Sequence, residues 1–444
     1  MRGKMRVLWV LNLMPPAIGE KLGEECSVKE GWISGLLEQV VKEKAAEEIS
    51  LGICYPVRTR EEEKRREIRL GEKNILCYGF AEDSIHHKAH EELRMSKRFQ
   101  QIFSDFQGDL LHLFGTEYGH CLAAAKAFNR PERILIGLQG IISECAKEYL
   151  ADLPREVYRR NSFRDLLKRD GMVRQQEKFA LRGEQEKEAM GLCRNVTGRT
   201  AFDQRAAYEI NPRARYFSMN ETLRKEFSNG RWEVNNCTPH RIFFSQADYP
   251  LKGFHYLLNS LPQIKKEFPD VTVAVAGNSL IRGEGLRERI KISGYGKYLK
   301  ELIKKVGMEE KIIFLGKLSA EEMKAEYLKC HTYVCASSLE NSPNSLGEAM
   351  CLGVPVVASD TGGIPSMLTN EKEGLLFPKG DEEALAQAVT RLWKDRDLCA
   401  RLSEAAAVRG RETHDGKRNF NRLLEIYGEI CGCTQYVTSS PRVD

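Results

Sequence analysis

The sequence has no apolar run that approaches the roughly 18 residues that a membrane-spanning helix needs. The apolar stretch Val7–Met14, which follows a short basic start, contains Asn12 and has no small-residue cleavage site after it. We therefore predict the first buried strand there, not a signal peptide. The protein is expected in the cytoplasm, with the option of peripheral contact at the inner membrane face.

The sequence also lacks a strong charge bias and any paired metal-ligand spacing. The net charge is only +5 for 444 residues, which argues against a nucleic-acid partner. The 13 cysteines are scattered, with no CxxC pair. Scattered thiols indicate a reducing compartment, with cysteine serving as small apolar filler, and we expect no metal or other cofactor to be required.

What the chain does contain is an alternation of short apolar runs and helical patterns, which predicts an α/β fold. The length suits two domains. Expected strands lie at 7–11, 49–55, 74–78, 110–114, 134–138, 195–197, 241–245, 271–276, 311–315, 332–335, 354–358 and 374–377. Helices are expected between them, for example at 31–44, 91–106, 120–128, 253–268, 345–352 and 382–393.

This pattern predicts two doubly wound Rossmann-like domains facing a cleft. The first domain is placed at residues 1–215, a linker with turn signals at 216–239, and the second domain at 240–414. The last helical stretch, about 415–432, could close either domain. The charged stretch Val57–Lys73 interrupts the first series and is interpreted as a solvated hairpin loop or surface insert.

The segment Glu340–Gly363 carries the strongest functional pattern. Its loop and helix start are suited to a diphosphate, because a helix N-terminus offers unpaired backbone N–H groups and partial positive charge. Asn344 or Ser345 is expected to cap that helix, and Asn344, Ser345 and Leu346 would supply the amides. Gly362 and Gly363, after Thr361, would let a second backbone approach closely. The carboxylates of Glu340 and Glu348 suit sugar and ribose hydroxyls.

The spacing Glu340 to Glu348, followed by Gly353-Val354-Pro355-Val356-Val357 and the Gly-Gly pair, resembles retaining glycosyltransferases of family 4. The resemblance implies the two-domain fold called GT-B and a nucleotide-diphosphate sugar as donor. It implies that Glu340 holds the donor sugar and Glu348 the ribose. Ser366 stands where many members have a further Glu.

The stretch Ser245–Gly253 is similar to the segment of the family that carries an Arg and then Lys-Gly. Lys252 and Gly253 match, whereas Gln246 or Ser245 occupies the place of the Arg. The resemblance implies that Lys252 stabilises the charge that grows on the leaving diphosphate.

Candidate residues in the first domain lie after expected strands, where ligands of parallel sheets bind. Gly31 matches one glycine of a pair that the family carries at a helix start, and it is assigned to the donor side. Glu117 or His120 would orient an acceptor hydroxyl, with a capped helix start as the alternative. Gln139 and Arg199 are acceptor-side candidates, and His112 is expected to be a satisfied buried histidine. The acceptor itself is expected to be a saccharide or a lipid-linked molecule.

Residues 155–182 are rich in Arg and Lys interleaved with apolar side chains. This stretch could meet anionic lipid head groups, and an amphipathic helix with a solvated face is the alternative. Asp395-Arg396-Asp397 matches the D-x-D metal pattern of other glycosyltransferases but is interpreted as a solvated helical face.

The sequence thus predicts a retaining hexosyltransferase, with a role in cell-surface polysaccharide assembly. Two alternatives remain. A nucleotide-sugar epimerase would act on the donor alone, and a non-catalytic sugar-nucleotide-binding protein would bind without turnover.

Overall fold

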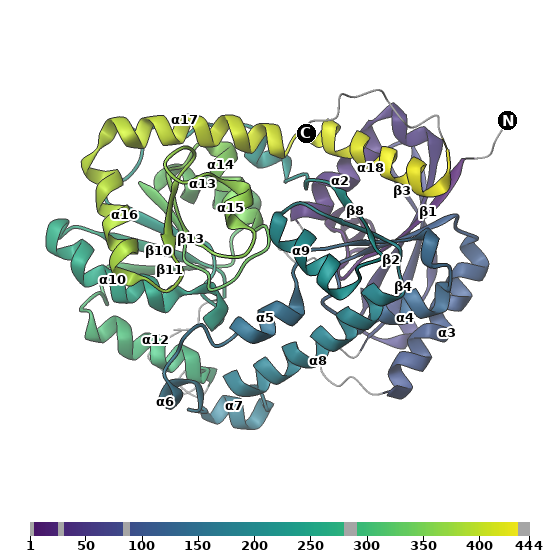
Figure 1. Cartoon of the computed structure of the whole chain (residues 1–444), viewed down its shortest axis with the longest axis horizontal. Coiled ribbons are helices and arrows are strands. Elements are labelled where there is room, and N and C mark those ends of the chain that lie inside the picture. Colours follow the sequence, from purple (N-terminus) through teal and green to yellow (C-terminus); the bar gives the residue numbers. More distant parts are fainter. Residues whose placement is uncertain (1–3, 25–30, 83–88, 279–290, 434–444) are drawn as a thin grey trace. The chain divides into compact units, whose positions relative to one another are not determined.

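The computed structural model describes residues 4–24, 31–82, 89–278 and 291–433 (Figure 1). The chain forms two compact units. The N-terminal unit comprises Met1–Ser143, Arg182–Leu223 and His414–Asp444, and the C-terminal unit comprises Glu144–Leu181 and Arg224–Thr413. Each unit is an α/β layer structure, as the alternation of apolar runs and helical patterns predicts, and the fold class is confirmed.

The N-terminal unit is built on an eight-stranded sheet of order β3-β4-β2-β1-β5-β6-β7-β8. All neighbouring strands are parallel except β3 and β4. The strands are β1 (Met5–Val10), β2 (Ile49–Val57), β3 (Arg65–Leu70), β4 (Lys73–Ala81), β5 (Leu110–Phe114), β6 (Ile134–Gly137), β7 (Asn195–Gly198) and β8 (Arg215–Ser218). The near-continuous apolar runs are buried because helices cover both faces of the sheet.

The helices of this unit are α1 (Pro16–Leu22), α2 (Gly31–Lys42), α3 (Ala89–Phe106), α4 (Gly119–Phe128), α9 (Ala201–Ile210) and α18 (Gly416–Cys431). Helices α5 (Ile142–Glu148) and α8 (Met172–Gly191) run through the boundaries between the units. The C-terminal helix α18 packs on α2, and its Phe420, Leu423 and Tyr427 belong to the core of the N-terminal unit.

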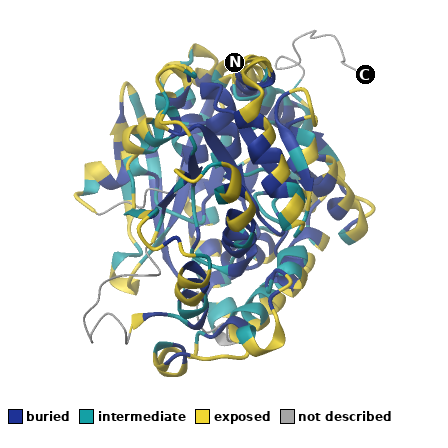
Figure 2. Cartoon of the chain, turned by 90° about the vertical axis from the view of Figure 1, so that its left-hand side faces the viewer, coloured by how far each residue is buried: buried dark blue, intermediate teal, exposed yellow. Residues whose placement is uncertain are grey.

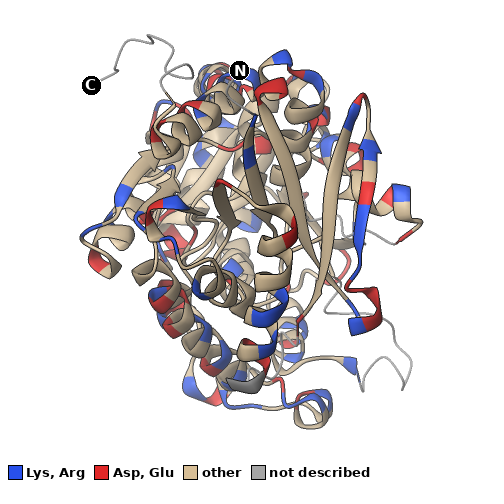
Figure 3. Cartoon of the chain, turned by 90° about the vertical axis from the view of Figure 1, so that its right-hand side faces the viewer, with Lys and Arg blue, Asp and Glu red and all other residues tan. Residues whose placement is uncertain are grey.

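Two strands of the N-terminal unit were not expected from the sequence. Residues 65–70, within the stretch interpreted as a solvated loop or insert, form β3, which pairs antiparallel with β4. Ile68 and Leu70 are buried, whereas Arg65, Glu67 and Arg69 are exposed. The strand therefore carries charges of both signs (Figure 3). Buried and exposed residues thus alternate with a period of two inside the charged run, which is typical of a strand. Its charged face suits an edge strand. Strand β8 lies within the last residues of the expected first domain and the start of the expected linker.

The C-terminal unit contains a six-stranded parallel sheet of order β11-β10-β9-β12-β13-β14. Its strands are β9 (Arg241–Phe244), β10 (Thr272–Ala276), β11 (Ile312–Gly316), β12 (Thr332–Cys335), β13 (Val356–Asp360) and β14 (Leu375–Pro378). Its helices are α6 (Arg155–Tyr158), α7 (Phe163–Lys168), α10 (Phe254–Glu267), α12 (Gly294–Lys305), α13 (Ala320–Lys329), α14 (Asn344–Leu352), α15 (Ile364–Met367), α16 (Glu382–Lys394) and α17 (Arg396–Thr413). The central strands β9 and β12 are buried throughout, whereas most of the edge strand β11 is part-exposed and its Ile313 is exposed (Figure 2).

The segment Glu144–Leu181 groups with the C-terminal unit, whereas the sequence assigned it to the first domain. Leu153 and Met172 are part of the core of the C-terminal unit. The Tyr256 hydroxyl donates to Asp152 Oδ2 at 2.7 Å, and the Gly294 amide donates to Asp165 Oδ2 at 2.6 Å. Local sequence patterns predict helices but not the core on which the helices pack. The sequence therefore assigned residues 144–181 to the wrong unit.

The expected linker, residues 216–239, is also divided between the units at Leu223 and Arg224. Its Trp232 is buried, and the indole Nε1–H donates to the carbonyl oxygen of Cys330 at 2.8 Å. The stretch is irregular but packed.

Candidate donor site and acceptor-side residues

The C-terminal unit has its topological switch point between β9 and β12. From β9 the chain moves outward through β10 to β11, and from β12 it moves in the other direction through β13 to β14. Ligands of open α/β sheets bind outside the carboxyl ends of the strands at such a point. The loops after β9 and β12 carry Lys252 and Glu340 respectively.

The Lys252-Gly253 pair is fixed by a close backbone approach. Gly253 has φ 69°, and a Cβ there would overlap the carbonyl oxygen of Ala336, at the end of β12. The Ser338 amide also donates to the Leu251 carbonyl oxygen at 2.8 Å. Only glycine allows this approach, which brings the loop of Lys252 against the loop of Glu340.

Lys252 and Glu340 form a partly buried ion pair. Lys252 Nζ lies 2.6 Å from Glu340 Oε1, and their side chains are 20% and 15% exposed. Burial disfavours the charge of Lys252, but the negative charge of Glu340, Tyr249 and the hydrogen bond to Glu340 outweigh it. They hold the pKa of Lys252 well above its ordinary value. The Ser337 hydroxyl donates to the same carboxylate oxygen at 2.8 Å.

The Thr361-Gly362-Gly363 loop supports the backbone of the Glu340 loop. The Gly363 amide donates to the Glu340 carbonyl oxygen at 2.9 Å, and the Thr361 hydroxyl donates to the Ser338 carbonyl oxygen at 2.9 Å. A Cβ at Gly362, where φ is 53°, would overlap the Glu340 carbonyl oxygen. The glycine pair therefore allows close approach of the Glu340 backbone, where the sequence predicted close approach to a ligand. The Gly363 amide already donates to the Glu340 carbonyl oxygen.

Helix α14 begins next to these loops. The N-cap residue is Pro343 and makes no side-chain cap, so the expectation of a cap by Asn344 or Ser345 was wrong. Both residues lie inside the first turn, because Pro favours the position just before or at a helix start. The Leu346 amide donates to the Pro343 carbonyl oxygen at 3.0 Å. Within the described residues, the amides of Asn344 and Ser345 donate to no backbone carbonyl oxygen.

Tyr333 on β12 ties the helix start to the loop after β9. Its hydroxyl donates to Ser345 Oγ at 2.8 Å and lies 3.0 Å from Ser245 Oγ. The Tyr327 hydroxyl donates to the Ser345 carbonyl oxygen at 2.8 Å. Neither tyrosine could be singled out from the sequence, because each acts through a contact between distant segments.

Glu348 has a different environment from Glu340. Its carboxylate is buried, with Oε1 accepting from Arg224 Nη2 at 2.8 Å and Oε2 accepting from the Tyr327 hydroxyl at 3.4 Å. Burial raises the pKa of Glu348, and the charge and hydrogen bond of Arg224 oppose this rise. Arg224 lies in the expected linker, and its guanidinium carbon lies 5.0 Å from the centre of the Phe227 ring.

Gln246, in the place of the family's Arg, points to a carboxylate. Its Nε2 donates to Asp248 Oδ2 at 3.2 Å, and Asn278 Nδ2 donates to the same oxygen at 2.9 Å. Among the described residues, Asp248 Oδ1 is a buried atom without a hydrogen bond. The loop after β9 therefore carries Lys252 together with an acidic group that the motif did not predict.

In the N-terminal unit, Glu117 lies at the switch point between β1 and β5. Its carboxylate accepts from the Gly140 amide at 3.3 Å and from Asn12 Nδ2 at 3.4 Å. A Cβ at Gly115, where φ is 87°, would overlap this carboxylate. Burial raises the pKa of Glu117. Gly31, the donor-side candidate of this unit, is the buried first residue of α2.

His120 is buried at the start of α4 and is held by Glu82, which follows β4. Its amide donates to Glu82 Oε1 at 3.1 Å, and Nδ1 lies 2.7 Å from Glu82 Oε2. Its ring also packs on Phe80, with ring centres 5.0 Å apart. The buried position of His120 and its contacts with Glu82 are consistent with both interpretations, a capped helix start and a role in orienting an acceptor hydroxyl.

Gln139 and Arg199 come together with Glu221, which the sequence did not single out. Arg199 Nη2 lies 2.9 Å from Glu221 Oε1 and donates to Gln139 Oε1 at 3.4 Å. Both charged side chains are less than one-tenth exposed. Burial raises the pKa of Glu221, while Arg199 opposes this rise.

Asp395 is the N-terminal residue before α17, where its side chain accepts from the Leu398 amide at 2.9 Å. Within the described ranges, no group of three His, Cys, Asp or Glu side chains is placed to hold a metal ion. No helix among those residues is long and apolar enough to span a membrane.

Comparisons with known proteins show what this domain resembles. Residues 231–409 match the family model of glycosyl transferases group 1. The chain is 30% identical over 191 residues to the phosphatidyl-myo-inositol mannosyltransferase of Mycobacterium leprae, covering 43% of this chain and 46% of the relative. It is 27% identical to a putative colanic acid biosynthesis glycosyltransferase of Salmonella typhimurium, covering 41% and 49%. The chain thus spans about half the length of the curated relatives it matches.

Solved structures share the fold over nearly the whole chain. The sucrose-phosphate synthase of Thermosynechococcus elongatus has a TM-score of 0.67 at 14% identity, covering 97% of this chain and all of that chain. The Anabaena HepE complex with UDP-glucose has a TM-score of 0.61 at 16% identity, covering 96% and 100%. The two Rossmann-like units therefore form the GT-B fold.

Proposed function

We propose that the protein transfers a hexose-type sugar from a nucleotide-diphosphate sugar to a saccharide or lipid-linked acceptor, with retention of the anomeric configuration. The observation that carries this proposal is the Lys252–Glu340 pair at the switch point of the C-terminal unit, beside the first turn of α14. Relatives named as sugar transferases support it, and one neighbour was solved with UDP-glucose. The relative named for colanic acid biosynthesis supports a role in surface polysaccharide assembly.

Each donor-side group has a role that matches its chemistry. Lys252 would stabilise the negative charge on the leaving diphosphate, together with the amides of Asn344 and Ser345. Glu340 would accept hydrogen bonds from hydroxyls of the transferred sugar. Glu348 would accept from the ribose through Oε2, because Arg224 already holds Oε1.

In this mechanism the acceptor hydroxyl attacks the anomeric carbon on the face from which the diphosphate departs. The bond from the anomeric carbon to the diphosphate oxygen breaks, a bond to the acceptor oxygen forms, and the diphosphate takes the acceptor proton. Lys252 and the helix amides supply the charge stabilisation that a metal ion supplies elsewhere, so we propose that turnover needs no added metal.

The test is turnover of Lys252→Met with UDP-glucose and GDP-mannose as trial donors. Removing the positive charge from the leaving group should lower kcat by about 100-fold or more. Lys265→Met, on the surface of α10 with its Nζ donating to the Gly307 carbonyl oxygen at 2.8 Å, is the matched control and should keep wild-type turnover. Near wild-type kcat in Lys252→Met, or an inverted product anomer by NMR, would refute the mechanism.

Two incubations separate transfer from the other two hypotheses. Free sugar-nucleotide product from donor alone would indicate an epimerase, and binding without turnover across an acceptor panel would indicate a non-catalytic protein. Addition of EDTA should leave turnover unchanged.

We further propose that α7 docks the protein on an anionic membrane. Phe163, Leu166 and Leu167 are 62%, 65% and 75% exposed on this short helix. Helix α7 is held rigidly by the capping box of Ser162 and Asp165, and Asp165 also accepts from the Gly294 amide. Large apolar side chains in water are costly, and a cluster of them favours insertion between lipids.

Basic residues flank this apolar cluster in the sequence. Arg155, Arg159, Lys168 and Arg169 are exposed. Each basic residue near an anionic surface contributes about 1 kcal/mol of attraction. Exposed apolar side chains combined with nearby basic residues suit an anionic lipid surface. This segment belongs to the unit that carries the proposed donor site.

Co-sedimentation with phosphatidylglycerol vesicles at low salt tests the docking. Leu166→Ser/Leu167→Ser should abolish sedimentation, and Arg159→Glu/Lys168→Glu should weaken it in a salt-dependent way. Leu93→Ser, at a leucine that is 59% exposed on α3, is the control and should not change sedimentation. Equal binding by wild type and by Leu166→Ser/Leu167→Ser would exclude this surface.

A further inference from the structure

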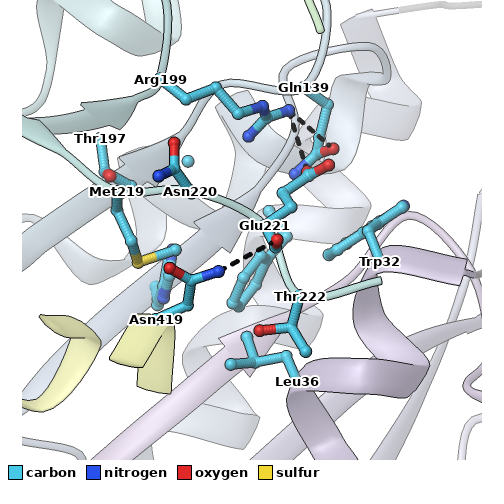
Figure 4. Close-up of a pocket in the computed structure, with 13 residues that line it drawn as sticks. Trp32, Leu36, Gln139, Thr197, Arg199, Met219, Asn220, Glu221, Thr222 and Asn419 are labelled. Atoms are coloured by element: carbon cyan, nitrogen blue, oxygen red, sulfur yellow. Dashed lines mark hydrogen bonds and ion pairs between the residues drawn. The ribbon is translucent and has the colours of Figure 1, made fainter. Parts of the chain in front are cut away.

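A narrow pocket with a mainly apolar lining lies within the N-terminal unit, past the carboxyl ends of β6, β7 and β8 (Figure 4). Trp32 and Leu36 of α2 and Asn419 of α18 line it opposite the strands. Gln139 and Arg199 belong to its lining, together with Thr197 and the segment 219–222. All of these residues belong to the N-terminal unit.

The pocket collects buried polar atoms that have no hydrogen bond within the described structure. They are His112 Nε2, Thr197 Oγ1, Arg199 Nε and Thr222 Oγ1. His112, Thr197 and Thr222 are each more than nine-tenths buried. A buried polar group without a partner is costly, so their gathering in one pocket indicates a ligand that completes them.

His112 was expected to be a satisfied buried histidine, and only one of its nitrogens is satisfied. The Trp9 indole can only donate, and it donates to the Tyr427 hydroxyl oxygen at 2.8 Å. The Tyr427 hydrogen is then available for His112 Nδ1, which lies 2.7 Å away. Burial lowers the pKa of His112 to about 3, so the ring is neutral and its proton sits on Nε2. A Cβ at Gly137 would lie 3.1 Å from Nε2, so glycine leaves this donor open to the pocket.

The charges of the pocket cancel. Arg199 and Glu221 form an ion pair at 2.9 Å, and His112 is neutral. An anion would meet the Glu221 carboxylate, and a cation would meet the Arg199 guanidinium. The unsatisfied groups are the N–H donors of His112 and Arg199 and the hydroxyls of Thr197 and Thr222. A hydroxyl group of a ligand can accept from the donors and can donate to or accept from the hydroxyls.

We propose that this pocket binds an uncharged sugar or polyol through hydroxyl groups at the edge of its ring. The pocket is too narrow for a whole ring, and the aromatic faces of Trp32 and Phe114 line it beside the polar atoms. An apolar wall with a few converging polar groups is typical of small-molecule sites. The ligand is either the acceptor of the transfer or an effector that is not consumed.

Titrations with methyl α-D-glucopyranoside, methyl α-D-mannopyranoside and myo-inositol, followed by ligand-observed NMR, test the proposal, with inorganic phosphate as the charged comparison. At least one uncharged probe should bind and phosphate should not. Thr197→Val and Thr222→Val should each raise the Kd of that probe about 5- to 10-fold, because each removes one hydrogen bond. Neither should lower the melting temperature of the free protein, because each hydroxyl has no partner there.

Thr116→Val is the matched control in the same unit. The Thr116 hydroxyl is buried and donates to Glu186 Oε2 at 2.5 Å, so this variant should melt lower and bind the probe with unchanged Kd. Failure of all uncharged probes to bind, or an unchanged Kd in both Thr197→Val and Thr222→Val, would overturn the proposal and leave only an ordered water in the pocket.

Two further measurements keep this result separate from the proposed transferase activity. Thr197→Val should leave the affinity for UDP and GDP unchanged, so a failed pocket does not imply a failed donor site. Glycosylation of the bound probe in the presence of donor identifies it as an acceptor, and binding without consumption identifies it as an effector. Both outcomes support the pocket.

Discussion

Glu340→Gln should destabilise the protein, because burial opposes the charge of Lys252 and the substitution removes the carboxylate that offsets this cost. The substitution keeps the shape of the side chain but removes the charge that lies 2.6 Å from Lys252 Nζ. Breaking a buried ion pair by removing one partner costs about 3–5 kcal/mol. Since both side chains keep some exposure, we expect about 2–3 kcal/mol here, or a fall of about 4–12 °C in Tm for a unit of about 200 residues.

The pH dependence of this loss has a defined sign. In the wild type the pKa of Lys252 is raised, so the stabilisation is fully present below the pKa of an unfolded lysine, about 10.4. It is lost as the pH rises through the folded pKa. In Glu340→Gln, burial is no longer outweighed, so the folded pKa of Lys252 should fall below about 10.4. The stability of that variant should then rise with pH between its folded pKa and about 10.4.

Urea unfolding from pH 7.5 to 10 of Glu340→Gln and of Glu340→Gln/Lys252→Met measures this effect. The two proteins share every other titrating group, so the difference in their unfolding free energies isolates Lys252. We expect Glu340→Gln to gain stability relative to the double variant as the pH rises. A difference that stays flat or falls would show that Glu340 does not hold the charge of Lys252, and the reasoning would fail.

Other substitutions test the packing and the second carboxylate. Gly253→Ala should lower Tm by several degrees or prevent folding, because its Cβ would overlap the Ala336 carbonyl oxygen at a positive φ; differential scanning calorimetry measures this. Arg224→Met should destabilise by about 3–5 kcal/mol in urea unfolding, because it leaves the buried Glu348 carboxylate unpaired, whereas the same change with Glu348→Gln should recover part of the loss. Burial lowers the pKa of His255 to about 4, so stability should fall as the pH drops from about 6.5 to 4, and His255→Asn should flatten that fall in a Tm–pH series.

The strands and helices were largely predictable because the apolar runs that form them are local. The runs around β5 and β12 matched the observed strands residue for residue. Strand β3 was missed because its exposed face is charged, and only Ile68 and Leu70 mark its buried face. The assignment of residues 144–181 failed for a different reason: packing on one core or another depends on contacts between residues far apart in the sequence.

The same limit applies to the site. Lys252 and Glu340 could be proposed from sequence because each lies in a recognisable loop next to a strand end. Their direct pairing, across 88 positions of sequence, was not foreseen, nor was the pairing of Arg224 with Glu348 across 124. The positions of Thr197 and Thr222 could not be singled out from sequence, because a buried polar atom without a partner is recognisable only once the surrounding segments are in place.

The two carboxylates of the Glu340–Glu348 spacing are held by cations of different kinds, and this difference bears on their roles. Lys252 is a compact charge on a flexible stem, and in the proposed mechanism it would move to the diphosphate while Glu340 turns to sugar hydroxyls. Arg224 is a planar fork packed beside Phe227, and it fixes one oxygen of a buried Glu348. Under the proposed function, an exchange of partners at Glu340 would make the charge of Lys252 available where the bond breaks, and the fixed geometry of Glu348 would hold the nucleotide in place. The preorganisation for transfer would then come from Arg224, and the charge that responds to the leaving group would come from Lys252.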